Sequence, residues 1–138
     1  MGYSYLLGNR RLAQGSAPPT DARLPFDAVV LAAVEYQPEL PRYAVLRVPL
    51  EDRFPPDPPP DARTVAFIER AAGEVAREVR RGGRVLVTCA QGRNRSGVLA
   101  GLALVQLGCP GPQAAALIRR LRNGLTNPYF LRMVVRGT

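Results

Sequence analysis

Residues 85–101 read VLVTCAQGRNRSGVLAG and combine residue types that can do chemistry. Cys89 directly follows a run of β-favouring residues, and a turn containing Gly92 and two arginines separates it from the next apolar run. A thiol beside arginine at a helix N-terminus ionises with a pKa of roughly 3.5–7.5, compared with about 8.5 for a free thiol. We therefore predict that Cys89 is a thiolate at neutral pH and acts as a nucleophile.

The turn after Cys89 is suited to binding an anion. The pattern predicts a strand, a turn over residues 89–94 and a helix that begins at Arg95. Backbone N–H groups of such a turn converge, and the helix dipole adds roughly half a positive charge. Gly92 allows the backbone to bend where a side chain would clash. Because the planar fork of Arg95 can bind two oxygens, a dianionic phosphate is the ligand that fits this arrangement best.

Two absences narrow the remaining chemistry. The chain of 138 residues has no histidine, and all 19 of its basic residues are arginine. An imidazole base, a Schiff-base lysine and a Walker lysine are therefore excluded. Two cysteines are too few for a zinc cluster, so we expect neither a metal nor a cofactor. A carboxylate is the only plausible acid–base group for a site at this loop.

Charge is divided unevenly along the chain. Residues 1–78 hold nine arginines and all eleven acids, whereas residues 79–138 hold ten arginines and no acid, giving net charges of −2 and +10. The basic half contains the cysteine loop. Such a field favours anionic ligands, and a solvated helix face is the alternative explanation for part of it.

The elements around the loop indicate an α/β protein. Apolar runs predict strands over residues 3–7, 27–34, 43–48 and 84–88, and helical spacing predicts four helices. The first helix runs from an N-cap at Asp61 or Thr64 to Gly82, and the others cover residues 95–107, 112–123 and 128–135. We expect one domain over residues 1–138, with a central, mostly parallel sheet of four to five strands flanked by helices. Ligands of such sheets bind at the carboxyl ends of the strands.

The sequence also bears on the location of the protein. It contains no apolar run of membrane-spanning length, and its first residues lack the pattern of a signal peptide. We therefore expect a cytoplasmic protein without stable membrane insertion. The residues indicate no particular oligomeric state.

Cys89-x5-Arg95-Ser96 resembles the signature of the cysteine-dependent protein tyrosine phosphatases, and the length of the chain resembles their compact dual-specificity branch. The segment VPLED, residues 48–52, is similar to the Pro-x-x-Asp of that branch. The segments YLLGN and NPYFLRM are weaker similarities. The resemblance implies a dual-specificity-phosphatase-like fold and hydrolysis of phosphotyrosine in proteins or peptides, with phosphoserine and phosphothreonine as further substrates.

The resemblance also implies a role for each site residue. Cys89 would attack phosphorus, Arg95 would bind the equatorial oxygens, and Ser96 would assist departure of the thiolate. Asp52 would protonate the leaving oxygen and then activate water. The phosphate would be held by the loop, whose residues are Ala90, Gln91, Gly92, Arg93, Asn94 and Arg95.

Two departures from the family pattern affect these expectations. Thr88 stands where the family usually has histidine before the cysteine, so we expect the pKa of Cys89 to be lowered less fully than is usual. The separation between Asp52 and Cys89 is slightly longer than usual, because the stiff proline segment PPDPPPD, residues 55–61, is inserted. Asp57 in that segment is therefore a second candidate acid.

Alternative functions are left open. Arg93 and the acid-free C-terminal half favour a more anionic substrate, either a phosphoinositide or the 5′-triphosphate of RNA. The pair Asn94-Arg95 is similar to the loop of RNA triphosphatases of the same superfamily. A non-enzymatic phosphate-binding module would not need Cys89, Arg95 and Ser96 together. A rhodanese-like sulfur transferase would not need Asp52, and a buried structural cysteine would not need the loop.

Overall fold

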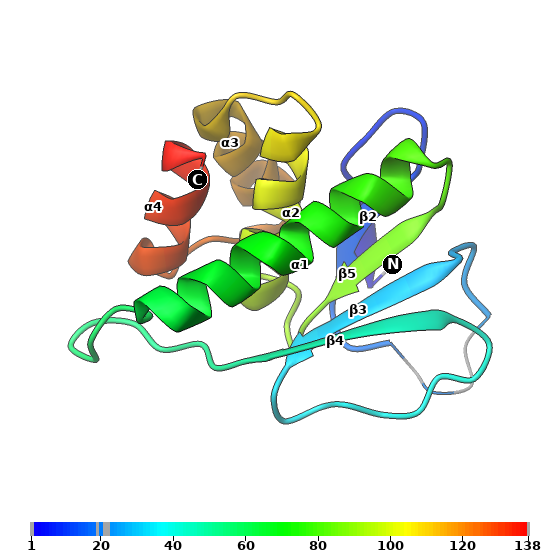
Figure 1. Cartoon of the computed structure of the whole chain (residues 1–138), viewed down its shortest axis with the longest axis horizontal. Coiled ribbons are helices and arrows are strands. Elements are labelled where there is room, and N and C mark those ends of the chain that lie inside the picture. The colour runs from blue at the N-terminus through cyan, green and yellow to red at the C-terminus, as the bar shows by residue number, and fades with distance from the viewer. Residues whose placement is uncertain (1, 19, 21–22, 138) are drawn as a thin grey trace.

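The computed structural model describes residues 2–18, 20 and 23–137, which form one five-stranded sheet and four helices (Figure 1). The order of the strands across the sheet is β1-β2-β5-β3-β4, and every neighbouring pair is parallel except β1 and β2. The prediction of an α/β fold with a mostly parallel central sheet is therefore confirmed. The strands are β1 (Tyr3–Tyr5), β2 (Leu12–Gly15), β3 (Ala28–Ala33), β4 (Ala44–Leu50) and β5 (Val85–Thr88).

The helices pack against one face of this sheet. Asp61 caps the first helix, because its carboxylate accepts a hydrogen bond from the backbone N–H of Thr64 at 2.8 Å. Buried side chains of all four helices join one core with the sheet, whereas Phe26 and Leu40, from irregular segments, cover the other face. In Figure 1 the first helix crosses the sheet and the other three are grouped beside it. The helices are α1 (Ala62–Arg80), α2 (Arg95–Gln106), α3 (Gly111–Arg122) and α4 (Pro128–Arg136). Among the described residues, no helix combines the length and apolar character needed to cross a membrane.

β2 is the one strand that the sequence analysis did not predict. It is four residues long, and Gln14 and Gly15 interrupt its apolar pattern. All four residues are nevertheless buried, because β2 lies between β1 and β5. Its end pairs with the end of β5, where Gly15 lies opposite Thr88, so β2 reaches the start of the cysteine loop.

Candidate active site

The loop between β5 and α2 is packed tightly against the end of β2. Cys89 donates its backbone N–H to the carbonyl of Gly15 at 3.3 Å. Gly92 adopts a φ of +68°, and a Cβ at this position would lie 2.5 Å from the carbonyl carbon of Gly15 and 2.6 Å from the nitrogen of Ser16. Only glycine fits this backbone geometry and this space. The end of β2 therefore fixes the shape of the loop that carries the thiol.

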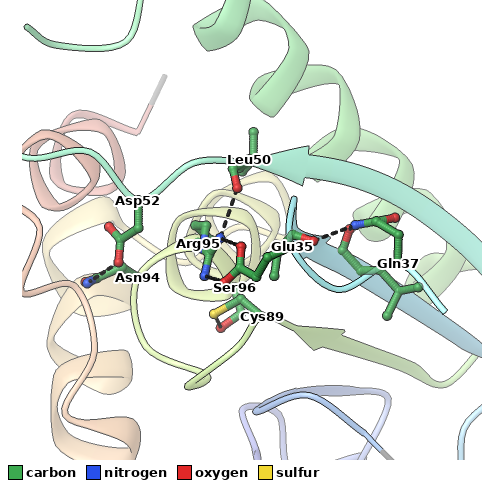
Figure 2. A network of polar contacts seen from close by, with 10 residues as sticks. Glu35, Gln37, Leu50, Asp52, Cys89, Asn94, Arg95 and Ser96 are labelled. Carbon is green, nitrogen blue, oxygen red and sulfur yellow. Dashed lines mark hydrogen bonds and ion pairs between the residues drawn. The ribbon is translucent and has the colours of Figure 1, made fainter. Parts of the chain in front are cut away.

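Arg95 begins α2, and its guanidinium is held from two sides (Figure 2). Its two terminal nitrogens donate to the two carboxylate oxygens of Glu35 at 2.5 and 2.6 Å. One of them also donates to the carbonyl of Leu50 at 3.0 Å. The Nε–H group is buried and has no hydrogen-bond partner within the described part of the chain. Because an unpaired buried donor is costly, this group is available to a ligand oxygen.

The contact with Arg95 keeps Glu35 ionised. Hydrogen bonding by the guanidinium is the largest cause that lowers the pKa of Glu35 from 4.5 to about 2. The same pairing raises the pKa of Arg95. Sequence reasoning missed Glu35, which lies just after β3. The signal that could have indicated it was an acid directly behind a buried parallel strand, at the sheet edge where ligands bind.

One cavity of about 190 Å³ brings most of the predicted residues together. Cys89 and Arg95 share its wall with Asp52, which follows β4. Ser96 lies below, with its Oγ 3.2 Å from the sulfur of Cys89, and Gly92 lies behind the loop against β2. The residues that line the cavity are Glu35, Asp52, Cys89, Ala90, Gln91, Arg93, Asn94 and Arg95.

The carboxylate of Asp52 is held by two amide side chains. One oxygen accepts a hydrogen bond from Asn94 at 3.0 Å, and the other accepts one from Asn127 at 2.8 Å. Asn127 also caps α4 through the backbone N–H of Tyr129 at 3.0 Å. Asn127 was not predicted as a site residue. It links the acid, the loop and the last helix.

Asp57 lies apart from this cavity. Its side chain is exposed on the proline segment, and its backbone carbonyl accepts a hydrogen bond from the hydroxyl of Tyr129 at 2.5 Å. It is not among the residues that line the cavity of Cys89. The structure therefore brings Asp52, and not Asp57, beside the thiol.

Thr88 does not act on the loop through its side chain. The hydroxyl is buried and donates to the carbonyl of Val30 at 2.8 Å, so it ties β5 to β3. The hydroxyl of Thr88 therefore does not supply the hydrogen bond to the loop that is expected of a histidine at this position.

The pairing of Glu35 with Arg95 leads to a testable prediction. In Glu35→Gln, Arg95 loses a charged partner, and we expect the affinity for vanadate to weaken by roughly tenfold. Because the pKa of Glu35 is lowered to about 2, its stabilising effect is complete above pH 4.5 and is lost as the pH falls toward 2. The difference in the free energy of unfolding between wild type and Glu35→Gln should therefore shrink over this range. Denaturant unfolding at several pH values measures it.

Glu39→Gln is the matched control for this variant. The side chain of Glu39 is 94% exposed, and the oxygen nearest Arg47 lies 3.5 Å away, so this pair contributes little. We expect neither vanadate affinity nor stability to change in the control. Equal behaviour of the two variants would show that Glu35 does not hold Arg95.

Comparison with known proteins supports an assignment to a class of enzymes. The chain matches no family model and no curated protein sequence. Among solved structures it is similar to human DUSP28, with 26% sequence identity and a TM-score of 0.79 over 99% of this chain and 93% of that chain. It is also similar to Tk-PTP in its active form, with 25% identity and a TM-score of 0.70 over 98% of this chain and 94% of that one.

A third similar structure is a mouse putative dual specificity phosphatase complexed with zinc tungstate. It has 24% identity and a TM-score of 0.77 over 99% of this chain and 86% of that chain. In the present chain the cysteine loop lies at the carboxyl end of β5, between the strand and α2. The fold is that of compact dual-specificity and tyrosine phosphatases, and the similarity to DUSP28 and Tk-PTP, together with the cysteine loop, supports a compact, dual-specificity-like cysteine phosphatase.

Proposed function

We propose that the chain hydrolyses phosphate monoesters of proteins, phosphotyrosine first, through a phosphocysteine intermediate. The observation that carries this proposal is that Cys89, Arg95 and Asp52 line one cavity. The unpaired Nε–H of Arg95 can bind an oxygen of a phosphate held there. The similarity to dual-specificity and tyrosine phosphatases supports a protein phosphatase function.

The proposed reaction has two steps. In the first, the thiolate of Cys89 attacks phosphorus, the bond from phosphorus to the ester oxygen breaks, and Asp52 gives its proton to that oxygen. In the second, the carboxylate of Asp52 accepts a proton from water while the water oxygen attacks phosphorus. The bond between phosphorus and sulfur then breaks, inorganic phosphate leaves, and the hydroxyl of Ser96 stabilises the released thiolate.

The size of the cavity supports a moderate preference for phosphotyrosine. A cavity of about 190 Å³ holds a phosphate group and little of a phenyl ring. Phe54, two residues after Asp52 in the sequence and 54% exposed, or Arg53 beside it would offer the ring a flat contact outside the cavity. Phosphoserine and phosphothreonine peptides should therefore also be hydrolysed.

A more anionic substrate is the second candidate, and Arg93 is the observation that favours it. Arg93 is exposed and lines the cavity beside Arg95, so it can bind a further phosphate. Either a phosphoinositide or the 5′-triphosphate of RNA would supply one. Whichever substrate is used, we also propose that the protein is cytoplasmic.

A comparison of substrates at one salt concentration tests the proposal. We expect phosphotyrosine peptide to be turned over moderately faster than phosphoserine and phosphothreonine peptides, and all three faster than a phosphoinositide or triphosphorylated RNA. The measured quantity is kcat/KM by phosphate release. Complete rejection of the serine and threonine peptides contradicts the shallow site. Faster turnover of the RNA or the phosphoinositide than of the peptides would mean that the more anionic substrate, and not a phosphoprotein, is the substrate of this chain.

A further inference from the structure

Gln14 is a buried amide directly behind the cysteine loop. It lies in β2, its side chain has no exposed surface, and its Nε2 is 3.1 Å from the Oγ of Ser96. The same nitrogen is 3.1 Å from the carbonyl oxygen of Gly92 and 3.5 Å from that of Arg93. An amide nitrogen has two hydrogens, so the two short contacts account for both of them.

These contacts determine where the hydroxyl hydrogen of Ser96 can point. A serine in a helix often donates to the carbonyl four residues earlier, which here is that of Gly92. This carbonyl already accepts hydrogen bonds from Gln14 and, at 3.3 Å, from the Nε–H of Arg122. Gln14 also donates to the oxygen of Ser96 itself. The neutral thiol of Cys89 donates to the Oγ of Ser96 at 3.2 Å. Once the sulfur is ionised, the single hydrogen of Ser96 is left to point at it.

We propose that Gln14 is a positioning residue, which aims the hydroxyl of Ser96 at the sulfur of Cys89 and so stabilises the thiolate as it leaves the phosphocysteine. This inference rests on the proposed function. A thiolate can accept a hydrogen bond but cannot donate one, so the direction from Ser96 to Cys89 is the only one open once the sulfur is ionised. The effect should appear in the second step, because only there is the thiolate the leaving group.

The variant Gln14→Met tests this role with little damage to the fold. Methionine has nearly the same length and no donor. The Oε1 of Gln14 is buried without a hydrogen-bond partner among the described residues, so its removal also removes an unsatisfied oxygen. The variant leaves unchanged the charged groups around the thiol, which are Arg93, Arg95, Glu35 and Asp52.

Rapid-mixing kinetics with p-nitrophenyl phosphate separate the two steps. We expect Gln14→Met to keep a burst of p-nitrophenol equal to one turnover, while kcat falls by roughly tenfold and KM falls in parallel. Ser96→Ala should show the same pattern. The double variant should be no slower than Ser96→Ala alone, because both changes remove one hydrogen bond to sulfur.

Leu12→Val is the matched control, and Gln14→Leu is the second test variant if methionine does not fold. Leu12 is fully buried in β2, two residues before Gln14, and does not contact the loop through a hydrogen bond in the described residues. We expect the control to keep wild-type kcat and KM. If the kcat of the Gln14 variant equals that of the control, the proposal is overturned. It is also overturned if the losses in kcat of Gln14→Met and Ser96→Ala multiply in the double variant.

Alkylation of Cys89 by iodoacetamide separates this proposal from the proposed function. We expect the pH at which half of the thiol reacts as thiolate to be higher in Gln14→Met than in wild type or Leu12→Val. If wild type hydrolyses no phosphate ester, the proposed function fails, and the alkylation shift still decides the role of Gln14. If wild type is active and neither alkylation nor kcat changes, Gln14 has no such role.

Discussion

Cys89→Ser is expected to abolish turnover of every phosphate ester, with a loss on the order of 10⁵-fold or more. A serine hydroxyl stays protonated at neutral pH and is a weak nucleophile unless a base activates it. Asp52, the carboxylate in the cavity that is not paired with an arginine, is held by two amide donors and is assigned to the leaving group. Phosphate release by the variant, followed for hours at high enzyme concentration, measures the loss.

Binding should survive this change, which separates a lost nucleophile from a lost fold. Arg95 keeps its contacts with Glu35 and Leu50 in the variant, so inorganic phosphate should protect it from thermal unfolding as it protects wild type. Cys109→Ser is the control, because Cys109 lies outside the cavity and both cysteines are free. We expect the control to keep full activity. Full activity of Cys89→Ser would exclude covalent catalysis by this residue.

The chemistry of the thiol adds two expectations for the wild type. Peroxide should inactivate it by oxidising Cys89 to the sulfenic acid, and a thiol reductant should restore activity. EDTA should leave activity intact, because no step of the proposed mechanism uses a metal.

The parts of the fold that could be predicted are those encoded by neighbouring residues. The strand, turn and helix around Cys89 follow one another without interruption, so periodicity and glycine position are sufficient to locate them. β2 could not be found this way. Its four residues have no strong pattern, and pairing with β1 and β5, which are distant in sequence, holds it in place.

The same limit applies to the site residues that were missed. Each of them acts through a partner at least 60 residues away in the sequence. The pairs are Glu35 with Arg95, Gln14 with Ser96, and Asn127 with Asp52. The uneven charge along the chain was also an incomplete guide. Folding brings Glu35 and Asp52 from the acidic half beside Arg93 and Arg95, so the cavity carries charges of both signs. A count along the sequence cannot show this pairing.

The general acid can be identified by comparing two aspartates. Asp52 lines the cavity of Cys89, whereas the side chain of Asp57 is exposed on the proline segment. Each carboxylate oxygen of Asp52 accepts one amide hydrogen bond, and each keeps a second acceptor site. A proton can therefore bind to Asp52 without breaking either contact, which allows it to act as an acid while its direction stays fixed.

We therefore expect Asp52→Asn to slow phosphotyrosine hydrolysis by about 10²–10⁴-fold, which is roughly 3–5 kcal/mol of barrier. Asparagine keeps the shape of the side chain but has no proton to give. The acidic limb of the pH–rate profile should flatten in this variant. For p-nitrophenyl phosphate the loss should be small, because its leaving group departs without a proton.

Asp57→Asn is the matched control and should change the rate by only a few-fold, because its side chain does not reach the cavity. The two variants are compared by kcat/KM on the same phosphotyrosine peptide across the pH range. The reverse ranking would move the acid to the proline segment and require that segment to close over the thiol. Equal and negligible effects would favour a triphosphate substrate, since a diphosphate leaving group is already a weak base and has less need of an acid.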